Sequence, residues 1–277
     1  MTDASEWRGR VGDAWAEEWR RTDRSLSGIQ QALLDTLLPL LPPAAAVLDI
    51  GCGAGATSLA LADIRPDARI TGLDLSEPLI AAARDRAGKR AVFEIGDASA
   101  WNPADGRRFD VLMSRHGVMF FDDPVAAFRH LRGLAVAGAP LIFSCFRGRD
   151  ENRWAADLVP VIHQFAPQQA ALPPPPQGPF AFADPERIRS ILAGAGFDAA
   201  RIEPVDCDFI TGEGVDPVAE TIAYFRRIGP FAALSRDLEE ARRDEALAMV
   251  EAIAAGHRSG DRVVFSAAAW IVSCVSA

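Results

Sequence analysis

The chain has 277 residues, of which 49% are hydrophobic and 24% charged, and its formal net charge is −9. This composition is typical of a globular protein with a large core. An acidic balance argues against nucleic acid or an anionic membrane as the partner. We therefore expect no nucleic-acid partner and no membrane insertion, and the polar, acidic start of the chain predicts a cytoplasmic protein without a signal peptide.

The cysteines do not suggest a disulfide framework or a metal site. They lie far apart, form no C-x-x-C pair and predict reduced, mostly buried thiols. The four histidines add no spacing typical of zinc, so we expect no metal. The cysteines are Cys52, Cys145, Cys207 and Cys274.

Residues 5–41 have a helical pattern. Trp7, Trp15 and Trp19 are spaced for one side of a helix, and apolar residues from 29 to 41 follow a 3.6-residue period. Two interpretations remain open. The segment is either an arm packed on the edge of the sheet or a lid whose aromatic rings, Trp15 among them, lie near a cationic ligand.

The most informative stretch is 46–57, AVLDIGCGAGAT. A short apolar run leads through Asp49 into three glycines, Gly51, Gly53 and Gly55, and then into a helical pattern. This order of strand, turn and helix builds a small-molecule site at the carboxyl edge of a parallel sheet. Glycines let a ligand approach the backbone, and the free N–H groups of the helix start face it.

Alone, this stretch also fits the dinucleotide fingerprint G-x-G-x-x-A. Two further acids change the balance. Asp74 closes a second predicted strand and is placed, with Leu75, to hold the ribose hydroxyls. Asp97 follows a third strand and is suited to an adenine amino group, with the Ala98 N–H on a ring nitrogen. Together with Asp49, these carboxylates favour an adenosine ligand without phosphates, because they would repel a pyrophosphate.

The motifs at 47–55, 73–76, 96–98 and 109–114 occur in the order found in one family. The chain resembles the class I S-adenosylmethionine-dependent methyltransferases, in particular the subgroup of ubiquinone/menaquinone-biosynthesis and other small-molecule methyltransferases. The resemblance implies S-adenosylmethionine as the cofactor and S-adenosylhomocysteine (SAH) as its product. The sequence departs from the family's pattern at 137–140, where the family usually has Pro-Gly-Gly. We therefore expect altered turn geometry there rather than lost cofactor binding.

The implied fold class is α/β, a Rossmann-like doubly wound sheet. It is mostly parallel, with an antiparallel last strand between the fifth and sixth strands. Helices are expected at 154–165, 218–228 and 234–255, and the last two strands at 197–210 and 262–276. We expect Pro173–Pro176 to form a stiff polyproline stretch, either a spacer or a gate wall beside the substrate. The expected units are an arm or lid (1–45), a cofactor-binding core (46–146), helical cap insertions (147–183 and 213–260) and the C-terminal part of the core (184–212 and 261–277).

The segment after the fourth strand should meet the methyl end of the cofactor. Ser114 is placed to touch the methionyl part, and His116 is the candidate general base, or else a side chain lining the pocket. Arg115 either holds an acidic substrate or pairs with Asp122 or Asp123. The predicted acceptor pocket comprises Arg115, His116, Met119, Trp154 and Phe180.

The sequence therefore predicts an enzyme that moves a methyl group by in-line displacement to an O, N or C atom. The acceptor is a small apolar or aromatic molecule, and the protein is a monomer or homodimer. Three alternatives remain: an NAD(P)-dependent oxidoreductase, a non-catalytic S-adenosylmethionine-binding protein and a protein methyltransferase. The absence of a catalytic triad does not count against the prediction, because a base is needed only when the nucleophile arrives protonated.

Overall fold

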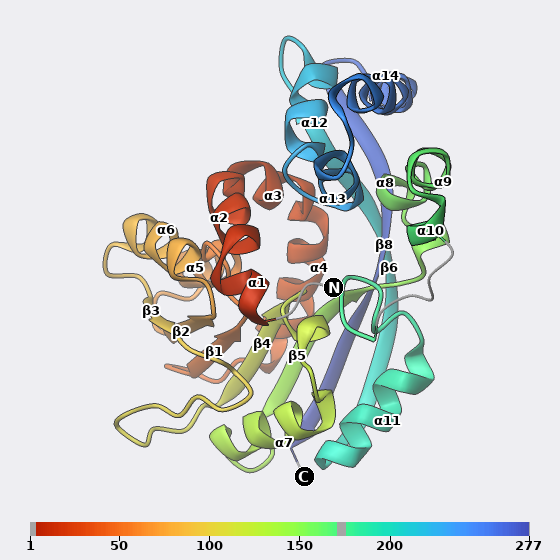
Figure 1. The fold of residues 1–277 in the computed structure, drawn as a ribbon. Coiled ribbons are helices and arrows are strands. Elements are labelled where there is room, and N and C mark those ends of the chain that lie inside the picture. Colours follow the sequence, from red (N-terminus) through yellow and green to blue (C-terminus); the bar gives the residue numbers. More distant parts are fainter. Residues whose placement is uncertain (1–3, 171–175, 277) are drawn as a thin grey trace.

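The computed structural model describes residues 4–170 and 176–276 of the chain. Its centre is one mixed sheet with the strand order β3-β2-β1-β4-β5-β8-β6, and the short strand β7 pairs with β8 (Figure 1). The strands are β1 (Ala46–Ile50), β2 (Arg69–Asp74), β3 (Val92–Ile95), β4 (Val111–Arg115), β5 (Pro140–Phe146), β6 (Phe197–Glu213), β7 (Arg258–Ser259) and β8 (Arg262–Ser276).

Helices cover both faces of this sheet. Successive residues of β1 point to opposite faces, so Val47 packs in the cluster with α4 and α5, whereas Leu48 packs in the cluster with α7 and α11. The predicted doubly wound α/β arrangement is confirmed. The helices concerned are α4 (Ser27–Leu37), α5 (Ala56–Ile64), α6 (Glu77–Ala87), α7 (Pro124–Leu134) and α11 (Pro185–Ala195).

Four helices begin at the same local signal, a Ser or Asp cap followed by proline in the first turn. The side-chain oxygen accepts a backbone N–H of that turn, and proline has no N–H to leave unpaired. The sequence therefore sets these starts locally. The caps are Ser76 of α6, Asp123 of α7, Asp184 of α11 and Asp216 of α12 (Pro217–Phe225).

The described part of the N-terminal arm, residues 4–45, contains four helices rather than one helix with the three tryptophans on one side. Trp7, Trp15 and Trp19 lie on three different helices, so the expected single helix side is wrong. The helical conformation is interrupted at Glu18, between α2 and α3, and the carboxylate of Glu18 is buried and pairs with Arg21. The arm helices are α1 (Ala4–Arg8), α2 (Arg10–Glu17), α3 (Trp19–Ser25) and α4, followed by the 3₁₀ turn η1 (Leu38–Leu40).

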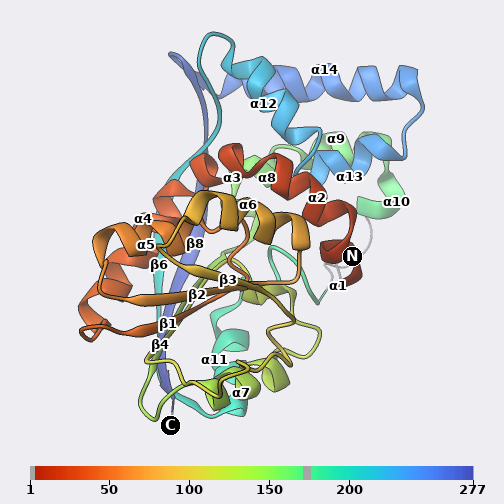
Figure 2. The ribbon, with the colours of Figure 1, turned by 90° about the vertical axis from the view of Figure 1, so that its left-hand side faces the viewer.

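A cap of helices lies at one end of the molecule, where β6 and β8 run beyond the rest of the sheet (Figure 2). Two predicted helices are each divided. The segment 154–165 breaks before Pro160, and the segment 234–255 breaks at 237–239. The cap helices are α8 (Arg153–Ala156), α9 (Val159–Phe165), α10 (Pro167–Ala170), α12, α13 (Pro230–Arg236) and α14 (Glu240–Gly256), and the further 3₁₀ turns are η2 (Val118–Phe120) and η3 (Arg149–Glu151).

The last strand, β8, lies between β5 and β6 and is antiparallel to both, as predicted. The pairing of β6 with β8 shifts register between Ile210 and Gly212. A Cβ added at Gly212 would lie 1.8 Å from the carbonyl oxygen of Pro217. The absence of a side chain at Gly212 therefore lets α12 approach the sheet closely.

Two expectations concern segments with little bearing on the sheet. Most of the predicted polyproline stretch, Pro173 to Pro175, lies outside the described residues. Within the described part of the chain, none of the helices combines the length and the apolar character needed to cross a bilayer.

Replacing Gly212 with alanine tests the close approach of α12. We expect G212A to lower the free energy of unfolding by about 3 kcal/mol, because the new methyl group overlaps backbone that cannot move freely. Gly133 is the matched control, since an added Cβ there meets no atom within 4 Å. G133A should change the stability by less than about 1 kcal/mol. Urea unfolding followed by circular dichroism measures both, and equal effects would contradict the packing argument.

Candidate active site

The turn after β1 brings bare backbone to the carboxyl edge of the sheet. Gly51 and Gly53 have φ of 64° and 55°, in the left-handed region that favours glycine. A Cβ added at Gly53 would meet nothing within 4 Å, so the backbone there borders open space. Gly55 follows at the N-cap of α5. The N–H of Cys52 donates to the Leu73 carbonyl of β2 (3.1 Å), which ties the turn to the neighbouring strand.

Asp74 is the residue that shapes this turn. Its carboxylate accepts the backbone N–H of Gly53 (2.8 Å) and that of Ser76 (2.9 Å). Burial raises its pKa, and the N–H groups of Ser76, Gly53 and Leu75 oppose the rise. The predicted ribose-binding acid is thus at the turn, partly exposed and with acceptor capacity left, since a carboxylate has about four lone-pair sites.

Asp49 lies beneath the same turn and is fully buried. Its Oδ2 accepts the hydroxyl of Ser58 (2.6 Å), whereas Oδ1 has no hydrogen-bond partner among the described residues. Burial raises its pKa to about 7, and the Ser58 hydrogen bond and the charge of Arg115 oppose this. A buried acceptor oxygen without a partner costs free energy, and a donor from a ligand could satisfy it.

Asp97 completes the row of acids at the adjacent strand end. The Gly96 N–H donates to the carbonyl of Asp74 (2.9 Å), which places Asp97 beside it. The Asp97 Oδ1 accepts the N–H and hydroxyl of Ser99, and Arg8 of the arm lies 3.6 Å from Oδ2. Ala98 is buried. The three predicted acids are therefore brought to one edge.

The turn after β4 is fastened directly to the turn after β1. The Ser114 hydroxyl donates to the Ile50 carbonyl (2.7 Å) and accepts the Gly117 N–H (3.1 Å). A Cβ on Gly51 would lie 2.8 Å from the Cα of Gly117. The hydroxyl of Ser114, a residue predicted to touch the cofactor through its side chain or its backbone, is thus engaged in joining the two turns.

Arg115 has partners that the sequence did not indicate. Its guanidinium donates to Gln30 of α4 (3.2 Å) and lies 3.4 Å from a carboxylate oxygen of Asp23 in α3. The expected pair with Asp122 or Asp123 is wrong, because Asp123 caps α7 and Asp122 accepts from Gln177. The polar partners of this arginine thus come from the arm.

His116 lies at the centre of an aromatic cluster. Its ring is 4.1 Å from that of Phe146, which contacts Trp154 (5.1 Å) and Phe180 (6.0 Å). Burial, assisted by the charge of Arg115, lowers the His116 pKa to about 3, so the imidazole is neutral at physiological pH. The predicted acceptor residues His116, Trp154 and Phe180 thus come together.

Met119 and Trp15 occupy supporting positions near this cluster. Met119 is buried, and its carbonyl accepts the N–H of Gly178 (3.1 Å), which holds the loop before α11. Trp15 contacts Trp7 (5.4 Å), and it is Trp7 that contacts Phe120 of the turn after β4 (5.1 Å). The Nε1–H of Trp7 is buried and lacks a partner among the described residues.

Sequence reasoning missed the residues that fasten the arm to the turn. Arg86 donates to the Ala54 carbonyl (2.6 Å) and to Asp23 (2.8 Å), and its guanidinium lies over the Trp19 ring (3.8 Å). No local sequence pattern predicts such contacts, because they join segments that are far apart in the chain. Phe146 could have been predicted from the sequence, because it ends β5, the strand next to the one that leads into His116.

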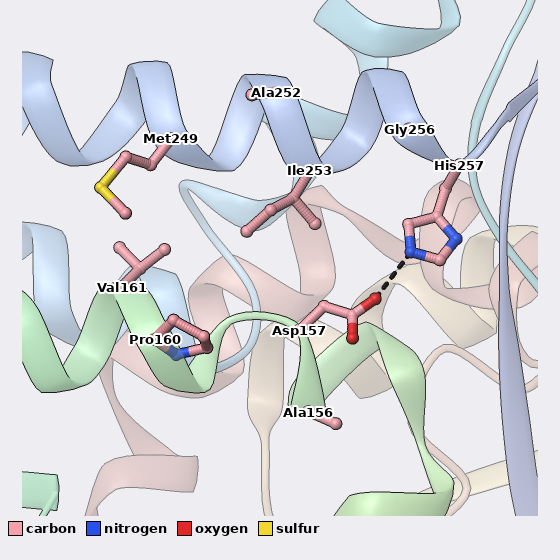
Figure 3. Close-up of a pocket in the computed structure, with 9 residues that line it drawn as sticks. All are labelled: Ala156, Asp157, Pro160, Val161, Met249, Ala252, Ile253, Gly256 and His257. Carbon is pink, nitrogen blue, oxygen red and sulfur yellow. Dashed lines mark hydrogen bonds and ion pairs between the residues drawn. The ribbon is translucent and has the colours of Figure 1, made fainter.

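A separate pocket lies between α9 and α14 (Figure 3). There Nε2 of His257 is 2.7 Å from a carboxylate oxygen of Asp157. It contains none of the predicted site residues, so it is not the site built by the two turns. It is lined by Ala156, Asp157, Pro160, Val161, Met249, Ala252, Ile253, Gly256 and His257.

Known proteins share this fold and this motif region. Residues 47–138 match the family model of a methyltransferase domain. A trans-aconitate 2-methyltransferase of Paracidovorax citrulli is 24% identical over 74% of this chain and 82% of its own length. A demethylmenaquinone methyltransferase of Roseiflexus castenholzii is 31% identical over 49% of this chain and 64% of its own length. The chain spans between 25% and 64% of the length of the first three curated relatives that it matches.

A solved structure supports the same assignment at the level of the fold. The magnesium protoporphyrin IX methyltransferase of Synechocystis PCC 6803, with bound SAH, superposes with a TM-score of 0.57 at 17% identity. The superposition covers 99% of this chain and 100% of that one. The matched domain and these relatives support the class I S-adenosylmethionine-dependent methyltransferases as the family, and the three acids lie at one edge of the same domain's sheet.

Proposed function

We propose that the protein transfers a methyl group from S-adenosylmethionine to a small acceptor with an apolar or aromatic body. One observation carries this proposal. The Asp74 carboxylate bonds to the backbone of Gly53, which borders open space, and Asp49, two residues before the same glycine turn, has a buried carboxylate oxygen without a partner among the described residues. A nucleoside with hydroxyl groups and an ammonium group, but without phosphates, matches these acceptors.

The residues present fit this cofactor. Asp74 would hold the ribose hydroxyls beside Leu75, and Asp97 the adenine amino group beside the Ala98 N–H. The free oxygen of Asp49 would receive the ammonium group. When bound, the cofactor supplies an electrophilic methyl carbon, and the protein's part is to align the acceptor with it in a dry pocket.

The acceptor would lie on the side of His116. Phe146 contacts this ring, Trp154 and Phe180 pack against Phe146, and Trp154 also stacks on Phe209 (5.1 Å). Such rings favour an apolar or aromatic body through contact area and stacking. A neutral imidazole is the polar group beside them that can orient the reacting atom.

In this proposal the arm, residues 1–45, acts as a lid over the cofactor. Its contacts follow the whole sheet edge, from Arg8 at Asp97 to Gln30, whose side chain meets Thr57 (3.4 Å). An added Cβ at Gly12 would lie 2.3 Å from the Ser76 hydroxyl oxygen, so α2 packs directly on the start of α6. The cap, residues 147–183 and 213–260, would close the acceptor side.

Titration calorimetry with S-adenosylmethionine and with NAD tests this function directly. We expect saturable binding of S-adenosylmethionine and SAH, and release of SAH when an acceptor is supplied. Saturable NAD binding without S-adenosylmethionine binding would contradict the proposal. Binding of S-adenosylmethionine without SAH release in any acceptor-containing extract would favour a non-catalytic binding protein.

Replacing Asp97 with alanine should weaken S-adenosylmethionine binding roughly tenfold, because one charge-assisted hydrogen bond is lost. Asp105 is a matched control, since it also accepts the N–H two residues further on (3.1 Å) but has no place in the proposed site. D105A should bind the cofactor like the parent protein. Calorimetry measures both affinities, and equal losses in the two variants would mean that the Asp97 carboxylate has no cofactor role.

The buried carboxyl of Asp49 predicts a pH dependence of cofactor binding. Its pKa of about 7 in the free protein should fall when an ammonium group binds, because the opposite charge favours the ionised form. The affinity should therefore decrease as the pH falls below about 7, and binding should release a proton from Asp49. D49N, which cannot titrate there, should bind more weakly and with a flatter pH profile.

The same shift has a consequence for stability. Between the unfolded pKa of about 4 and the folded pKa of about 7, the folded protein holds the Asp49 proton and the unfolded chain releases it. The free energy of unfolding should thus decrease as the pH rises through this window. Urea unfolding of the parent and D49N measures the difference. Identical pH slopes would show that the Asp49 carboxyl is not perturbed.

A further inference from the structure

The turn that carries His116 is held in an unusual backbone conformation. His116 has a φ of 63°, which a residue with a Cβ adopts only at a cost. The backbone is fixed by the His116 N–H, which donates to the Ser144 carbonyl (3.2 Å), and by the packing of Gly117 on Gly51. The backbone that carries the imidazole is therefore held directly beside the turn after β1.

The hydrogen bonds of the ring restrict its tautomer. Nδ1 of His116 lies 2.6 Å from Oγ of Ser144, and both side chains are more than nine-tenths buried. Among the described residues, the Ser144 Oγ has this one hydrogen bond, and Nε2 of His116 has none. The proton between serine and ring therefore decides which groups are left unpaired.

Two arrangements are possible. If Nδ1 carries the ring proton, the serine hydroxyl proton and the Nε2 lone pair both stay unpaired. If the serine hydroxyl donates to Nδ1, the ring proton is on Nε2, and Nε2–H and the lone pairs of the serine oxygen stay unpaired. The two arrangements leave equal numbers of groups unpaired, but 2.6 Å is shorter than N–H···O hydrogen bonds usually are and within the range of O–H donors, so the second arrangement is favoured.

We propose that Ser144 holds His116 as the Nε2–H tautomer, which donates a hydrogen bond to an oxygen of a carboxylate acceptor. This inference rests on the proposed methyl transfer and narrows its acceptor to a small carboxylic acid with an apolar or aromatic body. Ser144 is a positioning residue in it. His116 is a donor rather than the general base that the sequence suggested.

The chemistry follows from the proton count. With Nδ1 engaged by serine and Nε2 protonated, the ring has no lone pair for a substrate proton, so the nucleophile must arrive without a proton for the ring to remove, as a carboxylate does. One carboxylate oxygen accepts from Nε2–H, and the other uses a lone pair to form the bond to the methyl carbon. The carbon–sulfur bond breaks with its electron pair on sulfur. A carboxylate and a sulfonium thus become a neutral ester and a neutral thioether, and no proton moves.

The charges around the ring agree with an anionic acceptor. Arg115 acts on His116 from the adjacent position and helps to keep the ring neutral. The same positive potential favours a carboxylate beside the ring. Asp23 pairs with this arginine from α3, at 3.4 Å, and reduces its effect without removing it.

Ring-nitrogen NMR of protein labelled with ¹⁵N-histidine tests the tautomer without any need for turnover. The chain has four histidines, so H116Q assigns the His116 signals by their loss. We expect a neutral ring with Nε2 protonated between about pH 5 and 8, and a mixture of tautomers in S144A. S25A is the control, because Ser25 is equally buried but bonds to Tyr224 (3.2 Å). An Nδ1–H ring in the parent protein, or a ring that protonates in this range, overturns the proposal.

Benzoate, added to the SAH complex, tests the acceptor class, with benzamide as the neutral comparison. We expect benzoate to shift the Nε2–H signal and to bind more tightly than benzamide. H116Q, whose amide can donate from a similar position, should retain benzoate binding, whereas H116F should weaken it roughly tenfold. Both variants place a side chain with a Cβ at the same strained position, so backbone strain is matched.

The outcomes separate this inference from the proposed function. Loss of S-adenosylmethionine binding in the parent protein would refute the methyl transfer and leave the measured tautomer in place. Normal cofactor binding with no benzoate-dependent change at Nε2, or with equal benzoate affinity in H116Q and H116F, would overturn the carboxylate assignment alone.

Discussion

The site depends on a contact between the turn after β1 and the turn after β4. A side chain on either glycine at the contact would prevent it. The Cα of Gly117 would be 2.8 Å from a Cβ on Gly51, and the Ile50 carbonyl would be 2.6 Å from a Cβ on Gly117. Ser114 then bridges the same two segments with its hydroxyl. This backbone contact sets the turn after β1 and the turn that carries His116 at a fixed separation, which the proposed in-line displacement would require of its two partners.

Around this contact, the arm supplies polar partners to groups that the sheet alone would leave unpaired. Asp23 serves both Arg86 and Arg115, and Arg86 in turn satisfies the Ala54 carbonyl of the glycine turn. The arm is also joined to the cap, because Arg21 binds Glu220 of α12 through two nitrogens at 2.9 and 3.0 Å. The arm is thus bonded both to the side chain that holds the glycine turn and to the cap.

Much of the fold was predictable because its signals are local. The glycine turn, the acids at strand ends and the proline-marked helix starts each depend on a few neighbouring residues. The break between α2 and α3 was not predictable in this way. The sequence there favours helix, but the helix is interrupted at Glu18, which is buried and pairs with Arg21 and with Arg227 of the cap (3.1 Å). Pro160, by contrast, was a visible signal that the helix predicted at 154–165 is divided, because proline is tolerated in the first turn of a helix but not in its interior.

In the site, the sequence predicted the acids and the ring of His116 but not their partners. Asp23, Gln30 and Ser144 become neighbours only through folding, and their types are common enough to carry no motif. The position of β8 was inferred from the family resemblance rather than from periodicity. Local patterns thus predicted which chemistry is present, and long-range contacts decide how each group is charged and oriented.

The place of β8 in the sheet also bears on how the polypeptide is made. On a ribosome, β6 emerges well before β8 and has no neighbour to pair with until the intervening helices have been synthesised. A long strand waiting with unpaired N–H and C=O groups is open to intermolecular association. Closure of the sheet is therefore a late, non-local event in folding. Acidic side chains along β6, such as Asp206 and Asp208, would keep nascent chains apart until then.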